Sequence, residues 1–255
     1  MKILITGIAG TWGRAFVNHL KDNKEHEIIG IDNTEKAVVD FRRDYPGIKI
    51  YLKDFKDWGF AGAGFDLLIH LAAYKHIDEG EKNPIASIDN NVTKTKTLFI
   101  NAKNNGVQIL FVSTDKSVEP SSVYGATKFL GERIAQDLGG VVVRSGNIIN
   151  SSGSVLEIWE ECFKQSKPMP VTDLEMVRYF IDVKDAVMES WERFNKGEKL
   201  IILNGCKEVI LKDFLLEFLK TKGLETIADY KPGIKIIGLR GGEKLKDKLK
   251  WDFEK

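Results

Sequence analysis

The sequence predicts an α/β fold in which a doubly wound parallel sheet is followed by a smaller lobe. Short, nearly continuous runs of Val, Ile and Leu alternate with longer helical patterns over the first 146 residues. Such runs are typical of parallel strands that are buried on both faces. A glycine-rich turn directly follows the first run, at the place where folds of this class bind nucleotides.

The expected strands and helices alternate along this part of the chain. Strands are expected at residues 2–6, 27–31, 48–52, 66–71, 107–113 and 140–145, and helices at 12–22, 35–44, 84–104 and 122–137. A helix between successive strands returns the chain to the same end of the sheet. Neighbouring strands therefore become parallel, and helices cover the sheet.

The alternation changes after about residue 146. We expect a loop at 151–155, helices at 155–166, 183–195 and 210–221, a loop or edge strand at 167–173, and a strand at 234–239. This region is too small for a large core of its own. We therefore expect a dinucleotide-binding domain, residues 1–146, and a smaller substrate-binding lobe, residues 147–255, interleaved with the sheet edge. A lobe beside the carboxyl ends of the strands would close over a substrate.

Charge and composition exclude several classes of protein. The 255 residues include 38 basic and 37 acidic ones, so bulk charge attracts neither nucleic acid nor a membrane surface. No apolar run reaches the ~20 residues of a membrane-spanning helix, and the N-terminus does not resemble a signal peptide. Cys162 and Cys206 form no CxxC motif, and His70 and His76 have no further ligands nearby. We expect a cytoplasmic protein with free thiols and no metal.

The turn ITGIAGTWG places three glycines between the first strand and the first helix. Glycine permits a tight turn and a close approach of the backbone to a pyrophosphate, and the helix N-terminus supplies free N–H groups. Ordinary turn chemistry is the alternative. The pattern predicts a Rossmann-type dinucleotide site in which the phosphates contact Gly7, Gly10, Thr11, Trp12 and Gly13.

Further residues extend the predicted cofactor site. Asp32 ends the second strand, where a carboxylate can hold the adenosine ribose 2′-OH; otherwise it is a turn residue. Asp54 is either an adenine contact or a loop residue. Ala72 and Ala73 either leave room for a dinucleotide across the sheet or simply pack there. A carboxylate at position 32 repels a 2′-phosphate, so between NAD and NADP we favour NAD.

The stretch STDKSVEPSSVYGATK carries four groups that can move protons. Tyr124 and Lys128 lie one helical turn apart and share a face. A nearby lysine and a nicotinamide cation favour phenolate, so Tyr124 can take a proton from a sugar hydroxyl while the carbon gives hydride to the cofactor. Ser113 or Thr114 would steady the reacting oxygen. With the glycine turn, this arrangement resembles the extended short-chain dehydrogenase/reductase family.

Asp115 and Lys116 go beyond what alcohol oxidation needs. Taken alone, the pair is more simply interpreted as a surface ion pair, which contributes little to stability. As a catalytic pair, a neutral lysine would remove an acidified C5 proton and a protonated carboxyl would protonate the departing C6 hydroxyl. The net reaction is then loss of water without net use of cofactor.

The wider sequence resembles the UDP-N-acetylglucosamine 4,6-dehydratases, of the soluble, C5-inverting type, within the polysaccharide biosynthesis proteins. The blocks that carry this resemblance are HLAAYKHIDEGEKNP, STDKSVEPSSVYGATK, VRSGNIINSSGSV, PVTDLEMVRYF and IKIIGLRGGEKL. The resemblance implies a hydro-lyase that forms a 4-keto-6-deoxy UDP-sugar. It assigns C4 oxidation to Tyr124 and Lys128, C5 deprotonation to Lys116 and departure of the C6 hydroxyl to Asp115.

The resemblance also implies a set of residues that bind the nucleotide sugar. They are Lys75, His76, Asn147, Ser154, Val155, Thr172, Arg178, Arg240 and Glu243. Arginines suit the diphosphate because they bind it in a bidentate manner. The alternative for each residue is a structural role in a loop.

Two other functions remain open from the sequence. A UDP-sugar 4-epimerase or reductase of the same family would need Tyr124 and Lys128 but not Asp115 and Lys116. A catalytically idle NAD-binding scaffold is the third reading, because relatives carry arginine where this chain has Ser152 and continue beyond its last residue. We also expect a homo-oligomer formed through the helices at 84–104 and 122–137.

Overall fold

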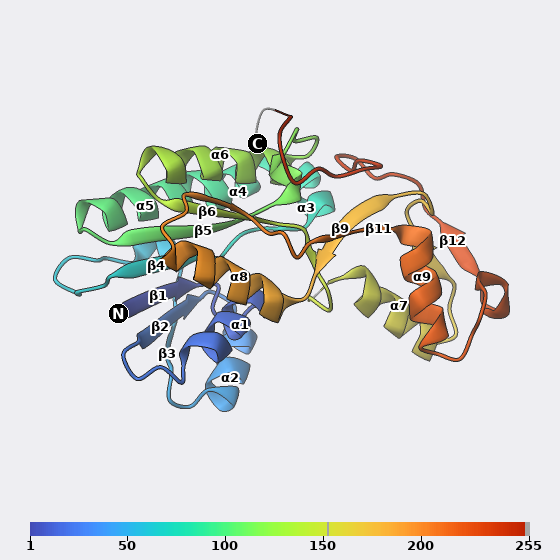
Figure 1. Ribbon diagram of the computed structural model, residues 1–255, viewed down its shortest axis with the longest axis horizontal. Coiled ribbons are helices and arrows are strands. Elements are labelled where there is room, and N and C mark those ends of the chain that lie inside the picture. The colour runs from blue at the N-terminus through green and yellow to red at the C-terminus, as the bar shows by residue number, and fades with distance from the viewer. Residues whose placement is uncertain (152, 253–255) are drawn as a thin grey trace.

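The structure is a computed structural model, and it describes residues 1–151 and 153–252. Within this part of the chain, seven parallel strands form the central sheet in the order β10-β6-β5-β4-β1-β2-β3 (Figure 1). Their bounds are β1 (Lys2–Thr6), β2 (Glu27–Asp32), β3 (Lys49–Leu52), β4 (Leu67–His70), β5 (Gln108–Thr114), β6 (Val141–Ser145) and β10 (Leu200–Ile202). The predicted parallel sheet is confirmed.

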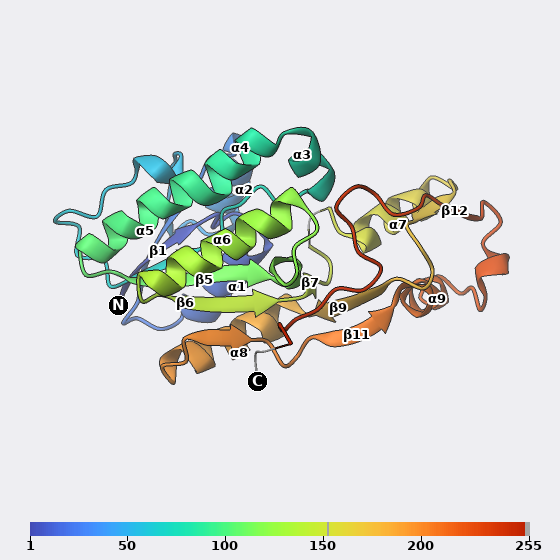
Figure 2. The ribbon, with the colours of Figure 1, turned by 90° about the horizontal axis from the view of Figure 1, so that it is seen from above.

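Helices cover both faces of this sheet (Figures 1 and 2). One layer contains α1 (Thr11–Leu20), α2 (Glu35–Asp44) and α8 (Val183–Asn195), and the other contains α3 (Ile77–Lys82), α4 (Pro84–Ile88), α5 (Thr95–Asn104) and α6 (Val123–Asp137). Alternate residues of β1 supply the two cores, because Ile3 and Ile5 pack with Phe16 of α1, whereas Leu4 packs with Phe99 of α5. The sheet is therefore buried on both sides.

The structure corrects several predicted elements. The helix expected at 84–104 is interrupted by a π-helical segment, η2 (Asp89–Lys94), whose Asn90 and Asn91 are buried. The helix α3, the strand β10 and the short 3₁₀ turns η1 (Phe55–Asp57), η3 (Asp115–Ser117) and η4 (Ile227–Asp229) were not expected from the sequence pattern. They are too short, or depend too much on distant partners, for a periodic pattern to indicate them.

The lobe has two small sheets and its own core. β11 (Lys207–Ile210), β9 (Val177–Ile181) and β7 (Asn147–Ile148) form one sheet, and β12 (Ile234–Ile236) pairs with β8 (Met169–Val171) in the other. The expected edge strand at 167–173 is thus β8. The helices α7 (Val155–Lys164) and α9 (Leu211–Lys220) pack around the fully buried Trp159. Figure 1 shows this lobe beside the carboxyl ends of the central strands.

The chain passes between the two parts more than once. α8 packs against α1, and β10 pairs with β6. Residues 183–203 therefore pack with the central sheet and its helices, although the first elements of the lobe precede them in the sequence. The boundary at residue 146 stays a prediction. What the structure adds is that the central sheet is completed only when the chain returns from the lobe.

The last described residues form a connection that we call the C-terminal strap, residues 240–252. It leaves the lobe after β12 and runs back over the carboxyl end of the central sheet toward α6 (Figures 1 and 2). The Lys244 ammonium donates to the carbonyls of Val118, at 2.7 Å, and Glu119, at 2.9 Å, in the loop before α6. The strap therefore joins the lobe to the loop that follows β5.

A buried ion pair connects α6 to β6. Arg144 Nη2 lies 2.7 Å from Glu132 Oε2, and the two side chains are 1% and 2% exposed. Ser117 also donates to Glu132, and Arg144 donates to the carbonyl of Leu249 in the strap. Removing one partner of a buried ion pair typically costs about 3–5 kcal/mol.

We expect Glu132→Ala to lower the free energy of unfolding by about 3 kcal/mol or more, because the buried guanidinium of Arg144 loses the carboxylate that pairs with it at 2.7 Å. Urea unfolding measures this change. The control is Glu192→Ala, which breaks an exposed pair with Lys196 on α8 and is expected to cost less than about 1 kcal/mol. Equal losses in the two variants would contradict the structural importance of the buried pair.

Candidate active site

The glycine turn after β1 is packed too tightly for larger residues. Gly7 has a φ of +68°, and a Cβ there would lie 3.0 Å from the amide nitrogen of Ala72. A Cβ on Gly13 would collide with the backbone of Ile8. Gly10 donates to the carbonyl of Gly7 at 3.1 Å and precedes the first residue of α1. The three glycines therefore bring turn, helix and the loop after β4 into direct contact.

The N-terminus of α1 is suited to an anion. Thr11 and Trp12 are its first two residues, the N-cap Gly10 offers no side-chain cap, and the first turn contains no acidic residue. The first N–H groups of a helix have no partner within the helix and carry its positive dipole end. This geometry fits a pyrophosphate at the predicted place.

The two acidic residues of the predicted cofactor site differ in their surroundings. Asp32 ends β2 beside the glycine turn, and its carboxylate accepts the amide of Thr34 at 3.1 Å. Asp54 caps η1 through the amide of Lys56 and forms an ion pair with Lys94 at 2.8 Å. Burial opposes the charge of Asp54, but its hydrogen bonds, first that from Lys94, lower its pKa. Asp54 therefore already has structural partners.

The loop after β4 crosses the end of the sheet next to the glycine turn. Ala72 and Ala73 are half-buried there, and Ala72 faces Gly7. The buried Asn91 fixes this loop, because its side chain accepts the amide of Tyr74 and donates to its carbonyl, both at 2.8 Å. It also donates to Thr127 of α6. Asn91 was missed by the sequence analysis, although it binds the loop to the helix that carries Tyr124.

Four charged side chains meet where β5 ends. Lys116 Nζ lies 2.9 Å from Asp115 Oδ1 and 3.4 Å from Asp247 Oδ2, and Arg178 Nε lies 3.2 Å from the same oxygen of Asp247. Asp115 is 0% exposed and Asp247 is 2% exposed. The interpretation of Asp115 and Lys116 as a surface ion pair is therefore wrong, because the carboxylate is completely buried.

The electrostatics of this cluster are set by burial and by mutual attraction. Burial raises the pKa of Asp115, against the attraction of Lys116, and Asp247 raises it further. Burial opposes the charge of Lys116, but the carboxylates of Asp115 and Asp247 outweigh it and raise its pKa above the ordinary lysine range. The resting pair therefore holds its proton on Lys116. Thr114 donates to Asp115 Oδ1 at 2.9 Å, whereas Asp115 Oδ2 has no hydrogen-bond partner among the described residues.

Tyr124 and Lys128 begin α6, next to this cluster. Burial raises the pKa of Tyr124 to about 12, and the opposing influence comes first from Lys116. Burial lowers the pKa of Lys128 to about 7, and its Nζ donates to the carbonyl of Val112 at 2.6 Å. In the protein alone, the expected lowering of the tyrosine pKa by Lys128 is thus absent.

Several predicted substrate residues lie around the strap. Asn147 accepts from Lys116 at 3.2 Å and so belongs to the charge cluster. Arg178 donates to the carbonyls of Val177, Leu245 and Lys244 in addition to pairing with Asp247, so it fastens the strap to β9. A role of Arg178 toward a diphosphate stays a prediction.

Arg240 and Glu243 form a clamp at the start of the strap. Arg240 Nη2 lies 2.7 Å from Glu243 Oε1, and the amide of Arg240 donates to the other carboxylate oxygen. Arg240 Nη1 lies 2.9 Å from Asp78 of α3. The Arg240 side chain is 48% exposed. The two ion pairs thus fix the orientation of the Arg240 guanidinium between α3 and the strap.

The remaining predicted substrate residues approach from the loop after β4 and from α7. Burial lowers the pKa of Lys75, and the carboxylate of Glu157 on α7 partly opposes this shift. His76 precedes α3, and a Cβ on Gly153 would lie 3.1 Å from its ring. Ser154 caps α7 by accepting the amide of Glu157.

Val155 and Thr172 both lie in the lobe. Val155 is the first residue of α7 and packs on the lobe core. Thr172 follows β8, and its carbonyl accepts the amide of Gly238 after β12. Ser152 lies outside the described residues. The structure thus places Val155 and Thr172 in the lobe itself.

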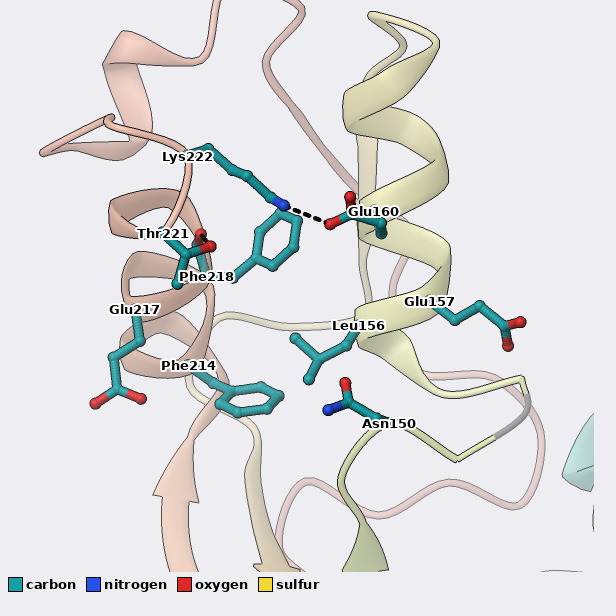
Figure 3. A pocket seen from close by; sticks show the side chains of 9 residues that line it. All are labelled: Asn150, Leu156, Glu157, Glu160, Phe214, Glu217, Phe218, Thr221 and Lys222. Carbon is teal, nitrogen blue, oxygen red and sulfur yellow. Dashed lines mark hydrogen bonds and ion pairs between the residues drawn. The ribbon is translucent and has the colours of Figure 1, made fainter. Parts of the chain in front are cut away.

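A separate pocket lies between α7 and α9 (Figure 3). Phe214, Phe218 and Leu156 give it an apolar side, and the ion pair between Lys222 and Glu160 spans its rim at 2.6 Å. Among the described residues that line it, none belongs to the predicted site. The predicted chemistry is therefore not located in this pocket.

The parallel sheet, the glycine turn and the helix of Tyr124 and Lys128 define a Rossmann-type protein with the architecture of short-chain dehydrogenases/reductases. The same fold occurs in UDP-glucuronic acid 4-epimerase from Bacillus cereus, solved with UDP-glucuronic acid and NAD, with a TM-score of 0.86, 18% identity and coverage of 98% of this chain and 90% of that one. No helix among the described residues is long and apolar enough to cross a bilayer.

The comparison of sequences is more specific. The family described as polysaccharide biosynthesis protein matches residues 3–255, so the chain belongs to that family. An inverting UDP-N-acetylglucosamine 4,6-dehydratase of Campylobacter jejuni is 30% identical, with 95% of this chain and 75% of the relative covered. A UDP-glucose 4-epimerase of Rickettsia rickettsii is 29% identical, with 97% and 76% covered.

We expect Lys128→Met to stabilise the protein near pH 7 and to lose this advantage toward pH 10. The folded-state pKa of Lys128 is about 7, against 10.5 ordinarily, so between these values only the unfolded chain binds the proton. Wild-type stability therefore rises with pH in this window, by up to about 1.4 kcal/mol per unit from this group. Urea unfolding at three pH values measures the difference between the two proteins.

The control is Lys184→Met, at an exposed position of α8. It should show no pH-dependent difference from the wild type over the same window. A constant difference between wild type and Lys128→Met at all three pH values would contradict a buried, easily deprotonated Lys128.

Proposed function

We propose that the protein is an NAD-dependent nucleotide-sugar 4,6-dehydratase, acting on UDP-N-acetylglucosamine with inversion at C5. The observation that carries this proposal is the buried hydrogen bond between Asp115 and Lys116 at the end of β5. An oxidation or epimerisation at C4 has no use for such a pair. The inverting dehydratase among the relatives supports the same choice.

NAD fits the residues at the edge of β1 and β2. The glycine turn and the N-terminus of α1 would hold its pyrophosphate, and Asp32 would accept a hydrogen bond from its ribose. A carboxylate at this place disfavours the 2′-phosphate of NADP. When bound, NAD would supply the hydride transfer, from C4 of the sugar and then back to C6.

Tyr124 is the proposed base at the C4 hydroxyl. In the protein alone its pKa is about 12, so it needs added positive charge to become a phenolate near neutral pH. Lys116 already acts in this direction, and Lys128 on the next helical turn would add to it when its ammonium turns from Val112 toward the phenol. Thr114, which precedes the pair, would contact the same oxygen.

Asp115 and Lys116 would act as a proton pair after C4 is oxidised. Transfer of one proton along their 2.9 Å hydrogen bond gives a neutral amine and a protonated carboxyl without any exchange with solvent. Lys116 then removes the C5 proton, and Asp115 gives its proton to the C6 hydroxyl, which leaves as water. The proton that Tyr124 took from the C4 hydroxyl would finally be given to C5 on the face opposite Lys116, as inversion requires. This leaves Lys116 as an ammonium and Asp115 as a carboxylate, so the balance closes.

The UDP portion is proposed to lie between α3, the start of α7 and the strap. Asp78 and Glu243 hold Arg240 between α3 and the strap, where its partly exposed guanidinium can bind a diphosphate. Lys75 and His76 lie near the start of α7. The lobe and the central sheet would thus enclose the nucleotide sugar together.

The alternative is a 4-epimerase, which the Rickettsia relative supports. An epimerase would need the tyrosine, its lysine and a dinucleotide, just as the proposed dehydratase would. It does not need a proton acceptor at C5. Dependence of turnover on Lys116 therefore separates the two activities.

We expect the purified protein with NAD and UDP-N-acetylglucosamine in deuterated water to form a 4-keto-6-deoxy UDP-sugar that carries deuterium at C5. NMR detects the product, and the coupling at C5 reports inversion or retention. Lys116→Met should lower this turnover by about 10²- to 10⁴-fold, since it removes the proposed base. Lys36→Met, at an exposed position of α2, is the control and should match the wild type.

Other products would favour one of the alternative functions. A C4 epimer without deuterium at C5, formed equally well by Lys116→Met, would establish the alternative and overturn the dehydratase. Unchanged sugar with NAD firmly bound, for every UDP-sugar tried, would favour the idle scaffold.

We also infer that the protein self-associates through the outer layer of α4, α5 and α6. Ile85 is 83% exposed on α4, and Ile88, Ile100 and Leu130 of this layer are also exposed. Figure 2 shows these helices side by side on one face. Apolar side chains gathered on one face are typical of an interface between subunits. We further propose a cytoplasmic location, which suits the two free cysteines.

We expect the double variant Ile85→Asp, Leu130→Asp to convert an oligomer into monomers, because charges at an apolar interface lose their hydration on association. Sedimentation equilibrium measures the mass. Met188→Asp, at an exposed apolar position on α8, is the control for the opposite face. A wild type that is already monomeric, or a mass that changes only with Met188→Asp, would overturn this interface.

A further inference from the structure

Asp247 is a buried acidic residue that no step of the proposed reaction uses. It lies in the middle of the strap, within the lysine-rich run KLKDKLK, yet it is only 2% exposed. A carboxylate is almost never fully buried unless it is paired. Its partners therefore show what it does.

Those partners complete the coordination of the Lys116 ammonium. An ammonium has three N–H donors. Around Lys116 Nζ lie three oxygen acceptors: Asp115 Oδ1 at 2.9 Å, Asn147 Oδ1 at 3.2 Å and Asp247 Oδ2 at 3.4 Å. The three come from η3, β7 and the strap, so the position of the ammonium is defined from three separate segments.

Asp247 is itself held on both sides. Arg178 of β9 binds its Oδ2 at 3.2 Å and donates to the carbonyl of Lys244 at 2.8 Å. The amide of Val177 donates to the carbonyl of Leu245 at 2.8 Å. Hydrogen bonds from the lobe thus fix the strap directly before Asp247, and the Asp247 carboxylate points toward the buried cluster.

We propose that Asp247 is a positioning residue for Lys116, which keeps the amine aimed at the substrate C5 while Asp115 serves the C6 hydroxyl. The inference rests on the proposed dehydratase function. Asp115 cannot both hold Lys116 and turn to the leaving hydroxyl, whereas Asp247 and Asn147 remain in place. Because the strap carries Asp247, closure of the lobe becomes a condition for removal of the C5 proton.

The charges around Asp247 make this role sensitive to substitution. It faces Lys116 from η3, with Asp115 behind, and Arg178 and Tyr179 from β9, while Lys244 lies on the strap itself. Asparagine at position 247 keeps the shape but removes the negative charge. The change should disturb Lys116 and leave oxidation at C4, which depends on Tyr124, in operation.

The test separates the two halves of the reaction in the intact protein with NAD and UDP-N-acetylglucosamine. Absorbance of reduced nicotinamide in a single turnover reports C4 oxidation, and NMR in deuterated water reports C5 exchange and water loss. For Asp247→Asn we expect C5 exchange to slow by roughly 10- to 100-fold and C4 oxidation to change by less than about threefold. Asp247→Glu should recover part of the lost rate.

The matched control is Asp252→Asn, which removes an 84% exposed carboxylate of the same strap. It should leave both steps and the midpoint of thermal unfolding unchanged. Equal loss of both steps in Asp247→Asn, or no loss of either, overturns the positioning role. The first result would mean that Asp247 only maintains the fold.

A second measurement does not depend on turnover. Acetylation of Lys116 by acetic anhydride near pH 9, read by mass spectrometry, should accelerate about tenfold or more in Asp247→Asn, since removal of the anion lowers the pKa of the amine. Lys36 in the same digest is the internal reference. If the wild type converts no UDP-sugar but this acceleration occurs, the proposed function fails while the hold of Asp247 on Lys116 stands. An unchanged rate overturns that hold.

Discussion

The balance of charge around Lys116 is the constraint on which the site depends. An ion removed from water costs several kcal/mol unless partners replace its hydration. Lys116 is tolerated at the end of β5 because Asp115 and Asp247 face it, and Arg178 in turn balances the second carboxylate. These residues come from the central sheet, the lobe and the strap. Each part of the chain must therefore be folded in place before the charges of the others can be buried.

The parallel sheet decides where this cluster forms. The carboxyl ends of all seven described strands lie at the same end of the central sheet. The glycine turn after β1, the loop after β4 and the pair after β5 are therefore neighbours, although they lie far apart in the sequence. The π-helical turn with Asn91 ties the β4 loop to α6. The lobe completes the enclosure from the same side (Figure 1).

Most of the sheet and the local motifs of the candidate site were predictable, because a strand, a glycine turn or a Tyr-Lys pair on a helix is encoded in adjacent residues. Contacts made across the fold were not. β10 is only three residues long and depends on pairing with β6. Asp247 stands among lysines, a pattern typical of a solvated surface, and only the fold shows that Arg178 and Lys116 draw it inside. Local patterns report elements and motifs, whereas buried charge balance is a property of the assembled chain.

Dehydration and epimerisation can share this scaffold because only dehydration needs a proton to pass between a buried base and a buried acid. In the proposed reactions both begin by oxidation at C4, for which Tyr124 and a dinucleotide would suffice. Dehydration additionally needs a base and an acid that exchange a proton with each other but not with bulk water. In the proposed reaction Asp115 and Lys116 would meet this need while they stay covered. The strap covers them, held by Arg178 on the lobe and by the carbonyls of Val118 and Glu119 beside the pair. The same contacts that bury the charges would thus keep water from the proton pair.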